Sequence, residues 1–301
     1  MNSADQPPLS RYAFDRAAHR RTDEAWLAAA WPQSRVVAVS PKSTMPTDGS
    51  GRLAVRDPKT VDPEAPRRFL GMIDGVAFFA ATVEPDHDDT WQTLREFGAV
   101  ADDLGAALVT SAIALEQWHQ RHTHCPLCGA PTVETHAGWT RTCTVDASQH
   151  FPRTDPAVIM LVHDGGERTL LGRGHEWNAG RFSTLAGFVE PGESLEAAVA
   201  REVYEEVGVG VTDIEYIASQ PWPFPASLMV GFTARLDGDP SLTLDPVEMA
   251  EAAWFTRAEV AAARAWTDGT GPEPDARLHG ISPYLSISRY LIDRWLDGAS
   301  R

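Results

Sequence analysis

Three glutamates, Glu202, Glu205 and Glu206, stand at spacings that place their carboxylates along one arc of a predicted helix. Ser194 is the expected N-cap, and the helix should span 195–207. Positions i, i+3 and i+4 share a helix face, so three like charges meet at the edge of a core. Such charges raise one another's pKa unless cations lie among them, and hard divalent ions prefer carboxylate oxygens. The spacing therefore predicts a magnesium or manganese site.

These glutamates belong to a longer fixed pattern that runs from Gly187 to Val209. The segment fits G-x5-E-x7-R-E-U-x-E-E-x-G-U, with U aliphatic, at every fixed position, the others being Glu193, Arg201, Val203 and Gly208. It resembles the box of the Nudix hydrolase superfamily. The resemblance implies an α+β fold whose C-terminal part is a Nudix αβα sandwich with a mixed sheet. A solvated acidic helix with a few ion pairs is the alternative interpretation.

The resemblance also implies roles for the residues of the box. Glu202 and Glu206 would hold the catalytic ions together with the backbone oxygen of Ala186 and with Glu248, while Glu205 would share an ion or orient water. The general base is not decided by the sequence, and Glu206 is the favoured candidate. Arg201 is expected to orient the glutamates, and Glu193 to tether the loop before the helix.

A second motif, SQPWPFPASLM from Ser219 to Met229, follows the box. A loop stiffened by three prolines presents aromatic faces at low entropic cost. The motif resembles the SQPWPFPxS signature of the NADH pyrophosphatase branch of the Nudix hydrolases. For substrate binding the branch implies Gln220, Pro221, Trp222, Pro223, Phe224, Pro225, Ala226 and Ser227, together with Phe151, Phe188 and Ser288. Core packing is the alternative for each phenylalanine.

Three cysteines, Cys125, Cys128 and Cys143, lie within nineteen residues of one another. An odd number in so short a segment favours a metal site in a reducing compartment over disulfides. Related pyrophosphatases carry a four-cysteine zinc ribbon here, and Asp146 occupies the position of the fourth cysteine in this chain. We expect a structural Zn²⁺ site with Asp146 as fourth ligand, and His150 or His124 as substitutes. Three buried free thiols are the alternative.

Composition limits the class of protein. The chain has 301 residues, 43% of them hydrophobic, which is enough for two domains with cores. No apolar run reaches the roughly 18 residues of a membrane span, and the N-terminus lacks the apolar core of a signal peptide, so a cytoplasmic location is expected. The formal net charge of -16 opposes unspecific attraction to nucleic acid. The pairs Arg20–Arg21 and Arg67–Arg68 could guide RNA, but scattered solvated arginines are the favoured interpretation.

The anchors divide the chain into an N-terminal Nudix-like α+β domain over 1–120, a zinc-ribbon segment over 121–152 and a catalytic Nudix domain over 153–301. Within the first domain we expect a short helix after Thr22, an exposed loop over 40–66, a hairpin turning at Asp74-Gly75, and helix over 92–121 with a break near Gly105. The second half should contain a hairpin turned at 164–166 and strands at 183–190, 213–218 and 228–236. It should end with helices starting at the capping box Thr256-x-x-Glu259 and at Ser282-Pro283.

The function implied by the resemblance is metal-dependent hydrolysis of the diphosphate bond of NAD(H) to nicotinamide mononucleotide and AMP. It extends to removal of NAD caps from RNA 5′ ends (RNA deNADding), and the branch forms homodimers. Hydrolysis of ADP-ribose or another nucleoside diphosphate derivative is the first alternative. An inactive Nudix and zinc-ribbon protein that binds nucleic acid is the second.

Overall fold

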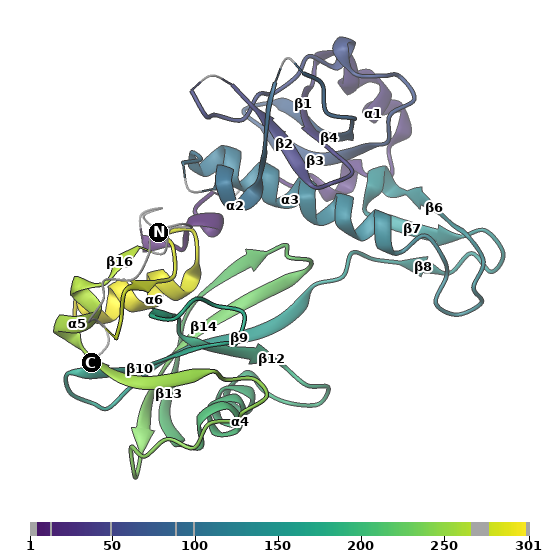
Figure 1. The fold of residues 1–301 in the computed structure, drawn as a ribbon. Helices are drawn as coiled ribbons and strands as arrows, with labels where there is room; N and C mark the ends of the chain where they lie inside the picture. The colour runs from purple at the N-terminus through teal and green to yellow at the C-terminus, as the bar shows by residue number, and fades with distance from the viewer. Residues whose placement is uncertain are drawn as a thin grey trace. The chain divides into compact units, whose positions relative to one another are not determined.

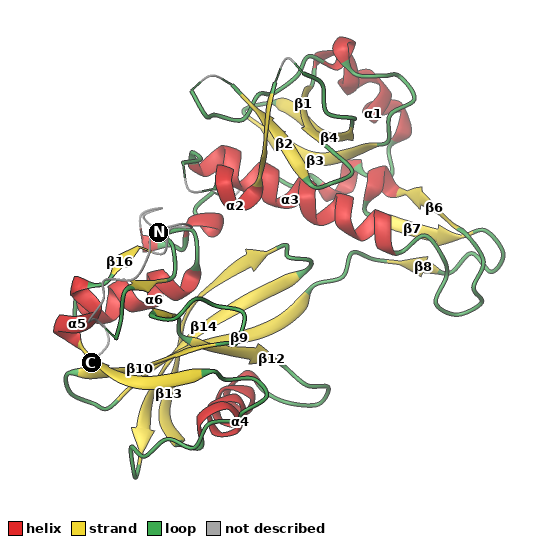
Figure 2. Ribbon diagram, viewed as in Figure 1, coloured by secondary structure: helices red, strands yellow, loops and turns green. Residues whose placement is uncertain are grey.

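The computed structural model describes residues 5–12, 14–48, 50–87, 89–98, 100–265 and 277–298. The chain forms two compact units. Unit 1 comprises Leu9–Thr154 and Pro221–Ala226, and unit 2 comprises Asp155–Gln220, Ser227–Arg301 and Asn2–Pro8. Each unit combines strands with helices, as Figures 1 and 2 show, so the α+β class is confirmed. Among the described residues, no helix has the length and apolar character needed to cross a membrane.

Unit 1 is built on a sheet of order β1-β4-β3, formed by Arg35–Val39, Val76–Thr82 and Arg67–Ile73. Strands β3 and β4 are the predicted hairpin, and its two turn residues, Asp74 and Gly75, have φ of 48° and 78°. Two consecutive residues with positive φ characterise the turn whose twist suits a two-residue hairpin. The helices of the unit are α1 (Glu24–Ala30), α2 (Leu94–Phe97) and α3 (Asp103–Arg121).

One expectation for unit 1 was wrong, and another was confirmed in part. The predicted loop over 40–66 contains strand β2 (Thr44–Thr47), which pairs with β5 (Thr90–Thr93) and is mostly buried. The helix predicted over 92–121 forms two helices, α2 and α3, and the predicted break near Gly105 is confirmed: α3 begins at Asp103, where the Asp102 side chain caps it by accepting from the Gly105 amide. Residues 92 and 93 belong to strand β5 instead. The side chain of Asp102 competes locally for backbone donors, which starts a new helix.

The ribbon segment consists of β6 (Thr132–Thr135), β7 (Thr140–Cys143) and β8 (Gln149–His150). It is joined to the rest of unit 1 by a buried polar network. Arg68 pairs with Glu116 of α3 and with Glu134 of β6, while His119 lies between the Gly138 carbonyl and Arg141. Arg68 is only 3% exposed, so the expectation of a solvated arginine was wrong at this position. Its charge is neutralised within the fold.

Unit 2 contains the predicted mixed sheet, with order β13-β14-β9-β10-β15 and with β12 also paired to β9. Strand β14 runs parallel to β9, whereas β10 and β12 run antiparallel to it. The strands are β9 (Asp155–His163), β10 (Arg168–Arg173), β12 (Leu185–Phe188), β13 (Gly210–Trp222), β14 (Ser227–Asp237) and β15 (Glu251–Thr256). A small second sheet joins β11 (Arg181–Phe182), β17 (Gly280–Ile281) and β16 (Arg264–Ala265).

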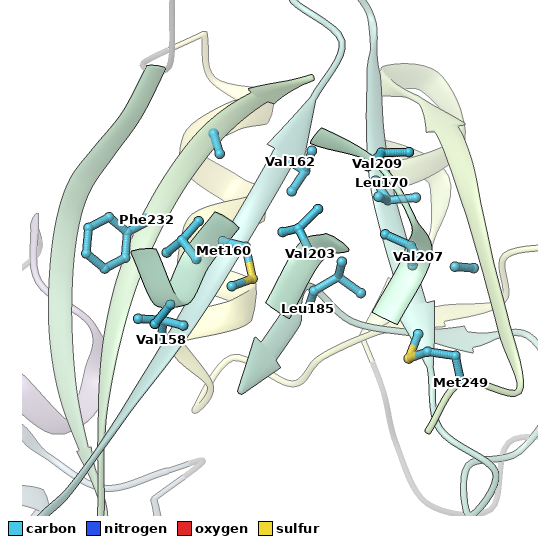
Figure 3. Packing of buried hydrophobic residues seen from close by; sticks show 14 of the residues in the cluster. Val158, Met160, Val162, Leu170, Leu185, Val203, Val207, Val209, Phe232 and Met249 are labelled. Atoms are coloured by element: carbon cyan, nitrogen blue, oxygen red, sulfur yellow. The ribbon is translucent and has the colours of Figure 1, made fainter. Parts of the chain in front are cut away.

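Helices cover both faces of the main sheet (Figure 1). Side chains of β9 alternate between the faces, as expected of a strand. Val158, Met160 and Val162 pack with α4 (Leu195–Val207), and Figure 3 shows Val203 and Val207 of this helix among them. Residues of opposite parity, such as Leu161, pack with α5 (Arg257–Ala262) and α6 (Ile287–Leu296). The αβα sandwich is therefore confirmed.

The capping box that begins α5 is present as predicted. Helix α6 begins later than predicted, because Ser286 caps it and the preceding residues form turns. The short 3₁₀ turns are Pro8–Ser10, Ala18–Arg20, Trp31–Gln33, Pro58–Thr60 and His136–Gly138.

Candidate metal-dependent active site

Helix α4 carries the glutamates and forms for the reasons visible in its sequence. The Ser194 hydroxyl accepts from the Ala197 amide at the start, and Gly208 adopts a left-handed conformation at the end. Val199, Val203 and Val207 are fully buried against the sheet. Anchoring this stripe fixes the rotation of the helix, and with it the direction in which the glutamates project.

Glu206 occupies an unusual environment. Its side chain is 7% exposed, and its Oε2 atom has no hydrogen-bond partner among the described residues. Burial, followed by repulsion from Glu202 and Glu248, raises the pKa of Glu206 to about 8. Glu202 is also buried, and burial raises its pKa. A buried carboxylate without a partner costs free energy, which a cation bound beside it would offset.

Arg201 holds the acidic residues around it through one guanidinium. It donates to both carboxylate oxygens of Glu193, at 2.8 Å each, and to Glu202 and Glu205, at 2.9 Å each. A further bond reaches the carbonyl of Phe188. The Arg201 hydrogen bonds lower the pKa of Glu193 to about 2. All three guanidinium nitrogens of Arg201 thus donate hydrogen bonds. Arg201 orients Glu202 and Glu205, and its bonds to Glu193 secure the loop before the helix.

Gly187 explains why β12 can approach α4 so closely. A Cβ atom at this position would lie 1.8 Å from Cδ of Glu202. Only a residue without a side chain leaves room for the carboxylate. Glu202 therefore lies directly against the backbone of β12, next to Ala186, whose carbonyl was a predicted ion ligand. Glu248 is exposed and close enough to repel both Glu202 and Glu206.

The predicted substrate residues of unit 2 fall into exposed and buried positions. Phe188, at the end of β12, is 59% exposed, and Ser227 begins β14 in a half-buried position. Gln220 is fully buried, and its amide donates to the Leu285 carbonyl. Ser288 is 1% exposed. Its hydroxyl lies within 3.1 Å of three other hydroxyls, those of Ser183, Thr184 and Ser282.

The other predicted substrate residues lie in unit 1. Phe151 is 65% exposed, and the segment Pro221–Ala226 presents Trp222 and Phe224 edge to face, with ring centroids 4.8 Å apart. Arg95 of α2 lies over both rings, and Gln117 of α3 donates to the Pro223 carbonyl. Two contacts from the helices of unit 1 thus fix the conformation of the predicted binding loop.

Cys125, Cys128, Cys143 and Asp146 form a cluster in which one ligand atom from each lies within 4.8 Å of all the others. Tetrahedral zinc–thiolate geometry needs sulfur atoms about 3.8 Å apart. Backbone amides of Leu127 and Val145 point at the Cys125 and Cys143 sulfurs. The Ser148 hydroxyl, followed by the backbone amides of Cys128 and Leu127, lowers the pKa of Cys125 to about 6. The donor set therefore fits a soft divalent metal ion.

Three hydroxyl residues around Ser288 and the steric role of Gly187 were not predicted from the sequence. Ser183 and Ser282 lie 105 and 6 residues away from Ser288. No local pattern marks residues that meet only through the tertiary fold. The sequence did contain a signal for the Gly187 contact. Glycine is the first fixed position of the pattern, and a position that requires glycine indicates a close approach of the backbone to another group.

Comparison with known proteins agrees with this geometry. The family model described as NUDIX domain matches residues 153–272. The chain is 41% identical over 297 residues to the NAD-capped RNA hydrolase NudC of Mycobacterium tuberculosis, covering 96% of this chain and 94% of that protein. NudC of Stutzerimonas stutzeri is 38% identical over 254 residues, covering 83% and 85%. Human NAD-capped RNA hydrolase NUDT12 is 42% identical over 200 residues, covering 64% and 42%. A complete box on α4 and similarity along nearly the whole chain place this protein in the Nudix hydrolase family, in the NADH pyrophosphatase branch.

Proposed function

We propose that this protein hydrolyses the diphosphate bond of NAD(H), giving nicotinamide mononucleotide and AMP, and removes NAD caps from RNA 5′ ends by cleaving the same bond. The observation that carries the proposal is Glu206, a buried carboxylate with an unpartnered oxygen beside Glu202 and Glu248. Its environment favours a divalent cation. Relatives named NAD-capped RNA hydrolase, similar along nearly the whole chain, support the choice of substrate.

The proposed holders of Mg²⁺ or Mn²⁺ are Glu202, Glu206, Glu248 and the Ala186 carbonyl, with Glu205 contributing from the rim. When bound, such an ion neutralises charge on the diphosphate oxygens and favours ionisation of water. The chain's own residues do the rest. Arg201 keeps Glu202 and Glu205 in fixed rotamers. Glu206, favoured as general base, would take a proton at its Oε2 atom, which has no hydrogen-bond partner within the described ranges.

Substrate orientation is assigned to aromatic and polar side chains. The exposed ring of Phe188 offers a face on which a planar base stacks. In unit 1, Phe151 and the segment Pro221–Ala226 are proposed to contribute further contacts, together with Gln220 and Ser227 at the segment's ends. Ser288 is proposed to act from within its hydroxyl cluster. Phe151 lacks a hydroxyl, so it can contribute only its ring face.

Three further assignments belong to the same proposal. The cysteine cluster with Asp146 would hold a structural Zn²⁺, since four ligands leave no position for water. The three domains would span 1–120, 121–152 and 153–301. We also propose a cytoplasmic homodimer: three reduced cysteines suit a reducing compartment, and sedimentation of the purified protein would test the dimer.

The test is turnover of NADH, NAD, ADP-ribose and NAD-capped RNA with magnesium or manganese. Wild type should release nicotinamide mononucleotide and AMP, and Glu206→Gln should lose activity by at least about a hundredfold, as expected for a group acting in proton transfer or ion binding. Glu215→Gln, an exposed glutamate on β13, removes the same charge and is the matched control. It should retain full activity.

Each other outcome points elsewhere. Activity confined to ADP-ribose would replace the substrate assignment and keep the hydrolase. Silence on every substrate with metal present would favour a nucleic-acid-binding protein with an inactive Nudix fold.

A further inference from the structure

Two arginines near the N-terminus, Arg16 and Arg21, stack on aromatic rings of unit 1, and no carboxylate of the described residues pairs with either one. The guanidinium carbon of Arg21 lies 3.6 Å from the ring centroid of Trp139, and that of Arg16 lies 4.3 Å from the ring centroid of Phe14. Arg16 also donates to the Ser111 hydroxyl of α3 at 2.8 Å. A stacked guanidinium keeps its plane fixed and its N–H edges directed outward along the ring.

The rings beneath these arginines are themselves held in place. The Trp139 indole N–H donates to the Phe69 carbonyl at 2.6 Å, which fixes the ring against β3. Phe14 lies over the backbone of Gly71, where an added Cβ would approach its ring to 2.9 Å. Both rings therefore lie against β3, at Phe69 and Gly71, which are two residues apart on the same strand.

The charge balance around Arg16 and Arg21 is unfavourable. Burial, and then the positive charge of Arg16, lower the pKa of Arg21, so the two guanidiniums repel each other. The Arg21 Nε atom is buried with no hydrogen-bond partner among the described residues. The neighbouring carboxylates are already engaged. Asp15 accepts from the Ala17 amide, and Asp23 accepts from the Trp26 amide and pairs with Arg20.

The environment of Arg16, which is exposed, and of Arg21, which is half-buried, differs from that of the buried Arg68. Arg68 is surrounded by Glu116 and Glu134, as a structural cation in an acidic protein should be. Arg16 and Arg21 have no paired carboxylate in the described part of the chain, although the chain carries a formal net charge of -16. Two neighbouring guanidinium groups without a paired carboxylate suit a phosphate, which accepts bidentate bonds from planar guanidinium groups.

We propose that Arg16 and Arg21, backed by Phe14 and Trp139, form a phosphate-binding site on unit 1, separate from the glutamates of α4. The ligand chemistry is a phosphate oxyanion. It can come from two sources, a phosphodiester of a single-stranded RNA chain or a free phosphate. The source in RNA rests on the proposed function, whereas the site itself does not.

The experiment measures binding of two probes by calorimetry, an uncapped single-stranded RNA oligonucleotide and inorganic phosphate, to the full-length protein at low salt. Arg21→Gln and Arg16→Gln should each weaken binding by about tenfold, the effect of one lost charge-assisted hydrogen bond. Arg21→Lys, which keeps the charge, should restore part of the affinity. Arg35→Gln, at an exposed position that begins β1, is the matched control and should bind as wild type does.

Salt dependence identifies the source. If RNA is the ligand, the slope of log affinity against log salt should fall by about 0.7 for each arginine removed. Binding of phosphate but not of RNA would keep the site and exclude the RNA source. If wild type binds neither probe, or both Gln variants bind as tightly as wild type, the site does not exist.

A thermal measurement separates binding from a structural role. If an arginine has only a packing role, its replacement should lower the unfolding temperature of the protein. If an arginine serves to bind a ligand, its replacement should leave the unfolding temperature of the unliganded protein unchanged or raise it, because the repulsion between Arg16 and Arg21 is relieved. Phosphate should raise the unfolding temperature of wild type but not of Arg21→Gln. Calorimetric binding and thermal unfolding do not depend on turnover. A negative result for the phosphate site can therefore be distinguished from a negative result for the proposed hydrolysis.

Discussion

Replacing Glu206 by glutamine should make the protein without Mg²⁺ or Mn²⁺ less sensitive to pH. Burial and two neighbouring glutamates raise the pKa of Glu206 from 4.5 to about 8. The folded state thus binds a proton that the unfolded state has released between these values. The stability contributed by this proton is complete below pH 4.5 and is lost as pH rises toward about 8. Glutamine has no proton to lose, so the variant escapes that loss.

The magnitude follows from the width of the interval. From pH 5.5 to pH 7 the wild type should lose about 2 kcal/mol of unfolding free energy relative to Glu206→Gln, at 1.36 kcal/mol per pH unit. A buried amide lacking partners costs about 1 to 3 kcal/mol, but this cost does not change with pH. The test therefore compares how the difference in unfolding free energy between wild type and Glu206→Gln changes with pH, since the constant cost of the amide cancels in that comparison.

Urea denaturation at several pH values provides the assay, in buffer without magnesium or manganese and without a chelator strong enough to remove zinc. Adding magnesium should stabilise wild type and leave Glu206→Gln unchanged, since the ion offsets the cost of the ionised carboxylate. Glu215→Gln should follow wild type at every pH. A stability difference that stays flat between pH 5.5 and pH 7 would refute the claim that Glu206 is protonated in the ion-free fold.

Three further changes test the site and its supports. Gly187→Ala places a methyl group 1.8 Å from the Glu202 carboxyl carbon, so NADH turnover should fall at least about tenfold, and normal turnover would contradict the close approach. Val203→Ala empties a fully buried position beneath the glutamates and should cost about 2 kcal/mol in urea denaturation, whereas Val247→Ala, 81% exposed, should cost under about 0.5 kcal/mol. Asp146→Cys supplies a softer ligand, so zinc should survive a higher chelator concentration, and equal release from both proteins would argue against Asp146 as a ligand.

Helix α4 could be predicted almost to the residue because its causes are local. Its cap, its apolar stripe and its terminal glycine all lie within fifteen consecutive residues. Strand β2 could not be predicted in this way. It is four residues long, contains Pro46, and owes its formation to pairing with β5 more than forty residues later. Proline and glycine counts indicate loops on average, but a short strand is stabilised by its partner.

The candidate site shows the same division. Sequence spacing could place Glu202, Glu205 and Glu206 on one arc, because a helix converts spacing into direction. It could not indicate that Ser288 would meet Ser183 and Ser282, since that meeting depends on how α6 packs on the sheet. Hydroxyl groups carry no periodic signature, and their role is set by burial.

The arginines show why charge alone is a poor guide to function. A net charge of -16 argues against an affinity for polyanions, yet binding depends on the local field, which differs from one arginine to the next. Arg201 forms ion pairs with three carboxylates and orients them. Arg21 pairs with no carboxylate of the described residues, and it stacks on the Trp139 ring near the positive charge of Arg16. The sequence does not distinguish Arg201 from Arg21. Their hydrogen bonds and ion pairs in the structure do: Arg201 positions carboxylates, whereas Arg21 is proposed to bind an anion.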